Sequence, residues 1–155
     1  MNENLYDTVI IGGGPAGYTA ALYCARSGLS VLVLEKMTPG GQMASTGQVD
    51  NYPGFDEGID GFTLGERMRK SAERFGAQTR FAEVTAVDLH AQPKRLTTAD
   101  GDILAQTVIA ATGAYPRELG LPEEASLRGR GVSYCAACDG MLYKDKSVVV
   151  AGGGN

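Results

Sequence analysis

The sequence predicts an α/β fold built around a parallel β-sheet. An apolar β-branched segment, an alanine-rich segment with helical spacing and a second apolar segment follow one another within about thirty residues. A strand, a helix and a strand in this order make both strands parallel, with a right-handed crossover. Glycine is the compositional outlier, with 22 residues. Because no collagen-like repeat is present, glycine must serve backbone positions where a side chain would clash.

Charge and hydropathy exclude several classes of protein. The 155 residues include 14 basic and 18 acidic side chains, for a net charge of −4, and nucleic-acid binding needs a basic excess. No apolar run approaches the roughly 18 residues that a membrane-spanning helix needs. The N-terminal segment has neither the basic nor the apolar region of a signal peptide, so we expect a cytoplasmic protein. Three cysteines are too few for a disulfide-stapled secreted scaffold.

The first strand–helix–strand unit has recognisable ends. The first strand is expected over Leu5–Ile11 and stops at three consecutive glycines. A helix is expected over Pro15–Ser27, because proline suits the first helical turn and Gly28 suits a C-terminal stop. The second strand, Ser30–Leu34, is followed directly by Glu35.

The middle of the chain predicts a long loop, a helix and a small antiparallel meander. A loop of the length of Lys36–Phe62 in a compact domain is usually functional or disordered, and its many turn residues favour an ordered, specific loop. Thr63–Phe75 has the pattern of an amphipathic helix. Gln78–Leu89 and Arg95–Thr98 are expected to pair in the meander, and Gln106–Ala111 is a further buried strand.

The composition changes after Pro116. Pro122–Gly131 is a charged loop, and Lys146–Ala151 is expected to form a strand that leads into a second glycine-rich segment. There, Gly152 and Gly154 repeat the opening of the first glycine motif, which indicates the start of a second nucleotide-binding fold. A plain glycine-rich tail is the alternative interpretation.

The first glycine motif has the spacing of a dinucleotide-binding turn. Gly12 allows a tight turn, Gly14 lets the backbone approach a pyrophosphate, and Gly17 lets helix and strand pack closely. The phosphates would lie on free N–H groups at the helix start. Glu35, at the end of the second strand, would accept hydrogen bonds from a ribose. The alternative is a glycine-rich turn that binds nothing.

Cys135 and Cys138 form a CxxC pair followed by Asp139. Such a pair favours reversible thiol chemistry, and Asp139 is the candidate proton donor or acceptor. If Cys138 opens a short helix, the helix dipole stabilises its thiolate. Structural zinc would need two further ligands, and Cys24 and His90 lie at no ligand spacing. We interpret Cys24 as a packing residue and His90 as a surface residue. Two inert buried thiols are a further alternative.

Five segments together resemble one family, the bacterial-type low-molecular-weight thioredoxin reductases. They are GGGPAG at 12–17, GGQM at 40–43, DNYPGF at 50–55, ATG at 111–113 and SYCAACDG at 133–140. The resemblance implies a homodimeric flavoprotein with two Rossmann-like domains. Residues 1–116 would form the N-terminal part of a three-layer FAD-binding domain, with a parallel sheet plus the meander. Residues 117–155 would begin the NADPH-binding domain that carries the CxxC, so we expect a truncated chain.

The resemblance also implies individual roles. The residues expected to hold the FAD pyrophosphate and ribose are Gly12, Gly14, Pro15, Ala16, Gly17 and Glu35. Those expected near the flavin, the adenine or elsewhere along FAD are Gly40, Gly41, Gln42, Asn51, Val84, Thr112 and Gly113. Cys138 would face the flavin, Cys135 would attack the thioredoxin disulfide, and Asp139 would handle the proton. Gly152 and Gly154 would start the NADPH site, and no metal is expected.

The implied activity is NADPH-dependent reduction of a thioredoxin disulfide through FAD and the Cys135–Cys138 pair. One alternative is a related flavin-dependent disulfide reductase that serves a peroxiredoxin module or takes electrons from ferredoxin. A chain that starts at the flavin strand disfavours an N-terminal fusion of this kind. The other alternative is a non-enzymatic dinucleotide-binding or thiol–disulfide fragment.

Overall fold

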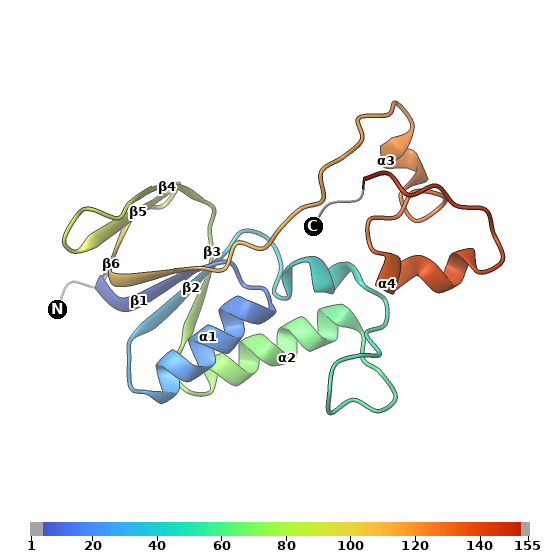
Figure 1. The fold of residues 1–155 in the computed structure, drawn as a ribbon. Helices are drawn as coiled ribbons and strands as arrows, with labels where there is room; N and C mark the ends of the chain where they lie inside the picture. Colours follow the sequence, from blue (N-terminus) through green and yellow to red (C-terminus); the bar gives the residue numbers. More distant parts are fainter. Residues whose placement is uncertain (1–4, 153–155) are drawn as a thin grey trace. The chain divides into compact units, whose positions relative to one another are not determined.

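The computed structural model describes residues 5–152, without the side chains of residues 137 and 138. The chain divides into two compact units, residues 1–113 and 114–155 (Figure 1). The first unit contains the sheet and two long helices. The second contains short helical turns joined by loops.

The first unit is built on a six-stranded mixed sheet whose strands run in the order β3-β2-β1-β6-β5-β4. β1 lies near its centre and pairs in parallel with β2 on one side and β6 on the other. The strands are β1 Leu5–Ile11, β2 Val31–Glu35, β3 Gln78–Phe81, β4 Val84–Asp88, β5 Lys94–Thr98 and β6 Gly101–Ala110. The parallel part confirms the predicted α/β fold.

Two helices pack together on one face of this sheet, α1 over Pro15–Arg26 and α2 over Gly61–Glu73 (Figure 1). α1 joins β1 to β2, as the glycine and proline signals predict. Tyr18 on α1 is buried against Ile10 and Val33 of the sheet. A second apolar cluster joins the β5–β6 hairpin to the parallel strands; its buried members are Tyr6, Val9, Leu32, Leu34, Leu96, Ile103 and Ala105.

The predicted meander is partly wrong. Gln78–Leu89 is not one strand, because β3 pairs in parallel with β2 at the sheet edge and β4 pairs antiparallel with β5. β2, α2 and β3 therefore make a second strand–helix–strand unit, whose crossover requires a parallel strand. The expected antiparallel pairing with Arg95–Thr98 is confirmed for β4, and β5 also forms a hairpin with β6, which begins at Gly101 rather than Gln106 because the whole of β5 pairs with it.

The long loop contains regular structure of its own, and α2 begins two residues earlier than the sequence indicates. A short 3₁₀ helix, η1, spans Gly41–Ser45, and Val49 pairs with Ile59 across the loop. α2 begins at Gly61 rather than Thr63, because the Asp60 carboxylate accepts a 2.8 Å hydrogen bond from Thr63 N and caps the helix.

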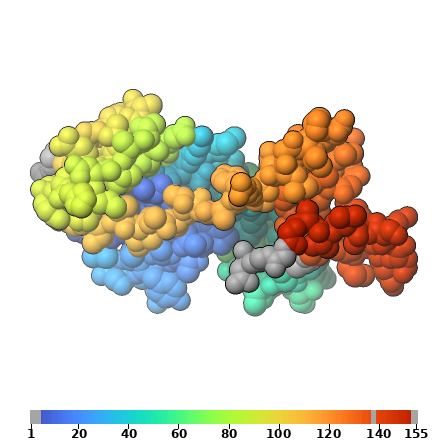
Figure 2. Space-filling view, turned by 45° about the horizontal axis from the view of Figure 1, so that its top comes forward, coloured from blue at the N-terminus to red at the C-terminus, as the bar shows by residue number. Residues whose placement is uncertain are grey.

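The second unit contains α3 over Glu124–Leu127, α4 over Ala136–Asp139 and the 3₁₀ helix η2 over Gly140–Tyr143. The strand expected over Lys146–Ala151 is wrong for this structure: no strand forms there, and Val149 is 96% exposed. An apolar strand needs neighbouring strands to bury it, and no described residue pairs with this segment. Figure 2 shows the red C-terminal segment on the surface.

None of the helices formed by residues 5–152 has the length and apolar character that a membrane crossing requires.

Candidate dinucleotide-binding and dithiol sites

The turn between β1 and α1 is held against two neighbouring segments. Gly12 N donates to Leu34 O at 2.8 Å, and Ala111 N donates to Ile11 O at 2.9 Å. Gly12 has a φ of 105°, and a β-carbon there would lie 2.2 Å from Ala111 O. The first glycine is therefore required by the backbone conformation and by the close approach of the segment after β6.

The third and second glycines of the motif differ in what surrounds them. A β-carbon at Gly17 would lie 1.9 Å from Gly12 O, so this glycine lets α1 pack onto the turn. A β-carbon at Gly14 would meet no atom within 4 Å, and its φ is −78°. The described residues thus give no steric reason for glycine at 14. An open position at a helix start fits the approach of a pyrophosphate.

The first turn of α1 offers main-chain donors to such a ligand. Gly14 is the N-cap, no side chain caps the helix, and Pro15 occupies the first turn. The first turn of a helix leaves N–H groups without intrahelical partners, and the helix dipole favours an anion there. Residues 12–17 therefore fit the phosphates of a dinucleotide.

Glu35 contacts the same turn, a contact that sequence reasoning missed. Its Oε2 accepts a 2.7 Å hydrogen bond from Gly13 N, and its Oε1 accepts from Met37 N at 2.9 Å and Thr38 N at 3.3 Å. A carboxylate has about four acceptor positions, so capacity remains for a hydroxyl group. Glu35 both braces the turn and fits the predicted role of ribose acceptor.

Gly13 is a further residue whose role the motif did not indicate. A β-carbon there would lie 3.0 Å from the Glu35 carboxylate oxygen Oε2 and 3.0 Å from the Tyr18 hydroxyl. Burial raises the pKa of Tyr18 to about 12, so this hydroxyl stays neutral at physiological pH. Glycine at 13 therefore preserves the bond to Glu35.

Replacing Glu35 should weaken binding of FAD to the full-length protein. We expect Glu35→Ala to lower the affinity by roughly ten- to a hundredfold, because charge-assisted hydrogen bonds contribute about 1.5–3 kcal/mol each. Glu35→Gln, which keeps the shape, should have a smaller effect. Flavin retention during dialysis measures both variants. Retention of FAD by Glu35→Ala at the wild-type level would make Glu35 a brace of the turn only.

The structure brings Gly40 and Gly41 to the glycine turn. Gly40 N donates to Gly13 O at 2.8 Å, and a β-carbon at Gly41 would lie 3.4 Å from Gly14 Cα. Gly65 on α2, which sequence reasoning missed, permits this approach, since a β-carbon there would lie 2.5 Å from Pro39 O. Gln42 follows on η1 with an exposed side chain.

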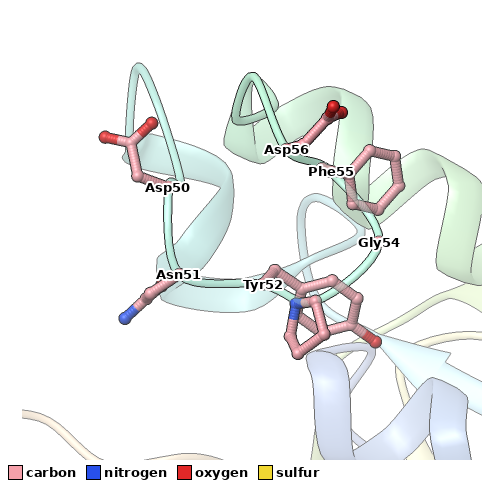
Figure 3. A pocket seen from close by; sticks show the side chains of 7 residues that line it. Asp50, Asn51, Tyr52, Gly54, Phe55 and Asp56 are labelled. Carbon is pink, nitrogen blue, oxygen red and sulfur yellow. The ribbon is translucent and has the colours of Figure 1, made fainter.

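Asn51 lies in a separate feature, a pocket of about 470 Å³ lined by residues 50–56. Figure 3 shows its amide pointing away from Phe55. The ring centroids of Tyr52 and Phe55 are 6.1 Å apart, and the Arg67 guanidinium lies 5.4 Å from the Phe55 centroid. Ring packing therefore orders this loop, as its turn residues predict.

The remaining residues expected along FAD occupy two places. Thr112 follows β6 beside Gly12, and a β-carbon at Gly12 would lie 3.3 Å from Thr112 Cα. Gly113 comes next with a φ of 74°. Val84 begins β4 and packs against the core that contains Leu34. Thr112 thus lies at the glycine turn, whereas Val84 lies on β4 in the antiparallel part of the sheet.

In the second unit, Cys135 is disulfide-bonded and Ser133 connects it to Asp139. Cys135 N donates to Ser133 Oγ at 3.2 Å, and Ser133 Oγ donates to Asp139 Oδ2 at 2.6 Å. Asp139 N in turn donates to Cys135 O at 3.0 Å. The structure therefore brings the predicted acid to the predicted cysteine through a serine that the motif did not indicate.

Cys138 does not open the short helix, because α4 begins at Ala136. The side chain of Cys138 and the whole of Gly154 lie outside the described residues. Gly152 is described, with a φ of 98°. Cys24 is a free thiol that packs against the α1 core.

His90 is exposed, as expected. Among the side chains that the structure describes, which exclude that of Cys138, no three metal-ligating groups converge.

The family model for pyridine nucleotide-disulphide oxidoreductases matches residues 6–155. The chain belongs to this family. The dinucleotide-type turn and the disulfide-bonded cysteine described above are the two features that the family's name combines.

Individual relatives narrow the comparison. A thioredoxin reductase of Streptomyces coelicolor is 50% identical over 155 residues, covering 99% of this chain and 48% of the relative. A thioredoxin reductase structure from Streptococcus pyogenes superposes with a TM-score of 0.79 at 46% identity, covering 92% of this chain and 46% of that one. A glucosaminate ammonia-lyase of Pseudomonas fluorescens is 48% identical over 147 residues, 95% of this chain and 46% of the relative. The chain spans about half the length of the curated relatives it matches.

Proposed function

We propose that the full-length protein carrying this chain is a thioredoxin-disulfide reductase that uses NADPH and FAD. The observation that carries this proposal is the presence of two features in one chain. The Gly12–Gly17 turn with Glu35 fits a dinucleotide, and a disulfide-bonded Cys135 lies next to Asp139. The relatives named thioredoxin reductase support the assignment.

The residues of the first unit would hold FAD. The turn at 12–17 would bind the pyrophosphate, Glu35 the ribose, and Gly40 and Gly41 would allow close approach along the cofactor. When bound, FAD supplies two-electron transfer between a nicotinamide and a disulfide. The protein's contribution is to place that cofactor and to exclude other reactions.

The residues of the second unit would carry out thiol–disulfide exchange. The reduced Cys135 thiolate attacks one sulfur of the thioredoxin disulfide, forming a mixed disulfide and releasing one thioredoxin thiolate. The Cys138 thiolate then attacks Cys135 Sγ, which restores the protein disulfide and releases the second thioredoxin thiolate. Asp139, held by Ser133, would deliver the proton to a leaving thiolate.

Further assignments complete the proposal. Residues 1–116 would belong to the FAD-binding domain and 117–155 to the NADPH-binding domain, with Gly152 and Gly154 at the start of the NADPH site. A homodimer and a cytoplasmic location stay predictions from the sequence and its resemblance.

Purified full-length protein tests the proposal directly. We expect a yellow protein that releases FAD on denaturation and oxidises NADPH only when oxidised thioredoxin is present. Absorbance at the flavin and NADPH bands measures both. A protein that contains no flavin and takes up none when FAD is added would overturn the proposal. Reduction of thioredoxin with ferredoxin but not NADPH as donor would favour the related reductase class, and flavin without any disulfide turnover would favour a binding fragment.

The relative named glucosaminate ammonia-lyase defines a second arm of the same experiment. Release of ammonia from a carboxylated amino sugar needs no redox dithiol, whereas Cys135 is disulfide-bonded in this chain. We therefore expect no ammonia from glucosaminate. Ammonia release that persists after the thiols are alkylated would assign the chain to that activity instead.

A further inference from the structure

Glu124, the first residue of α3, is a buried carboxylate that no sequence motif indicated. Only 5% of the residue is exposed. Its Oε1 accepts from Leu119 N at 2.9 Å, and its Oε2 accepts from Gly120 N at 2.7 Å and Leu121 N at 3.1 Å. Three successive main-chain N–H groups form a concave anion site, and here the chain's own carboxylate fills it.

The same carboxylate also holds the residue before the dithiol. The Tyr134 hydroxyl donates to Glu124 Oε1, and Tyr134 directly precedes Cys135. The Arg128 guanidinium lies 4.8 Å from the centroid of the Tyr134 ring and 3.8 Å from a Glu118 carboxylate oxygen. The pKa of Glu124 lies below its usual range, chiefly because Leu119 N donates a hydrogen bond to the carboxylate. The carboxylate therefore stays charged at neutral pH.

We propose that Glu124 is a positioning residue for the dithiol: acting through Tyr134, it fixes the backbone that carries Cys135 in the geometry in which the disulfide closes. The inference rests on the proposed function, because it treats the Cys135 disulfide as one that opens and closes. In this role Glu124 joins the 119–121 turn to the segment that enters α4.

The expected consequence is a change in how readily the disulfide forms. A held backbone limits the positions that two reduced thiols sample, which raises their effective concentration for each other. Releasing the backbone adds freedom to the reduced state, while the oxidised state stays cross-linked. Loss of the Tyr134–Glu124 bond should therefore lower the equilibrium constant for disulfide closure and make the disulfide easier to reduce.

Tyr134→Phe is the sharpest test, because it removes only the hydroxyl and keeps the ring under Arg128. In the full-length protein we expect the closure constant to fall about fivefold, which is about 20 mV toward a less negative potential at 29.6 mV per tenfold change. Equilibration in glutathione buffers, followed by alkylation and mass spectrometry of the cysteine peptide, measures this without flavin or thioredoxin. Tyr115→Phe, at a tyrosine that is 86% exposed, is the matched control.

A second variant tests that Tyr134 acts through Glu124. Glu124→Gln places an amide N–H₂ where an acceptor is needed, and we expect about a tenfold fall in the closure constant. Because both residues act through one contact, adding Tyr134→Phe to Glu124→Gln should change little further. Additive effects, or a Tyr134→Phe potential equal to that of Tyr115→Phe, would overturn the proposal. If Glu124→Gln does not fold, the tyrosine pair decides alone.

The potential separates this inference from the proposed function. A shifted potential in a protein that does not reduce thioredoxin would retain the positioning role and reject the proposed activity. Normal thioredoxin turnover by the wild-type protein, with no shift of potential in Tyr134→Phe, would support the proposed activity and reject the positioning role.

Discussion

Replacing either cysteine of the CxxC pair with serine should abolish thioredoxin reduction by the full-length protein. We expect a loss on the order of 10³-fold or more for both Cys135→Ser and Cys138→Ser, as for other nucleophiles whose removal blocks covalent catalysis. The physical reason is that one thiolate attacks and the other resolves the mixed disulfide, and a serine hydroxyl does neither. NADPH-dependent turnover of oxidised thioredoxin measures the loss.

Cys24→Ser is the matched control for this prediction. Cys24 packs within α1 as a free thiol, so its replacement should keep turnover and lower stability by about 1 kcal/mol at most. Wild-type turnover by either CxxC variant would show that the pair is structural. Equal loss in all three variants would point to a general effect of serine on folding.

The flavin spectrum should distinguish the two cysteines, whose proposed roles differ. The resemblance implies that Cys138 faces the flavin, so we expect Cys135→Ser to leave a thiolate that shifts flavin absorbance and Cys138→Ser to leave the flavin reducible by NADPH without that shift. A pH titration of the absorbance in both variants measures the difference. The opposite pattern would exchange the roles of the two residues.

The parts of the fold that the sequence predicted are those set by local chemistry. β1 has its predicted bounds, and α1 and β2 lie within one residue of theirs, because glycine, proline and apolar patterning act within a few residues. The partner of β3 was not predictable in this way. The sequence predicts that Gln78–Leu89 is extended, but only the α2 crossover decides that β2 is the neighbour of β3. Lys146–Ala151 shows the same limit, since its apolar residues form no strand without neighbouring strands.

In the candidate site, too, the sequence revealed the residues with a characteristic local spacing and not the contacts that the fold makes. The glycines at 12, 14 and 17 and the CxxC were visible because their spacing is itself the signal. The bond from Gly13 N to Glu35 and the bond from Tyr134 to Glu124 join residues whose spacing follows no known motif. In the sequence Glu124 is one acid of the charged loop expected over Pro122–Gly131, and only the fold shows that it is buried.

Gly17 and Gly14 of the first motif should respond differently to replacement with alanine, the first mainly in stability and the second mainly in FAD affinity. At Gly17 the new methyl group would lie 1.9 Å from Gly12 O, so the turn or α1 must move. We expect Gly17→Ala to lower the free energy of unfolding by about 3 kcal/mol or more, the upper range for overpacking, or to prevent folding. Chemical denaturation of the FAD-free full-length protein, followed by circular dichroism, measures this change.

At Gly14 the methyl group meets no atom within 4 Å, and a φ of −78° suits alanine. Two small effects oppose each other there: alanine is a poorer N-cap than glycine, but it reduces the freedom of the unfolded chain. Gly14→Ala should therefore unfold within about 1 kcal/mol of the wild type. Its FAD affinity should nevertheless fall on the order of a hundredfold, because the methyl group takes the space through which a pyrophosphate reaches the backbone. Dialysis of both variants against buffer measures flavin retention. Full retention of FAD by Gly14→Ala would show that the open position at the start of α1 does not face the ligand, and the phosphates would then have to lie elsewhere on the turn.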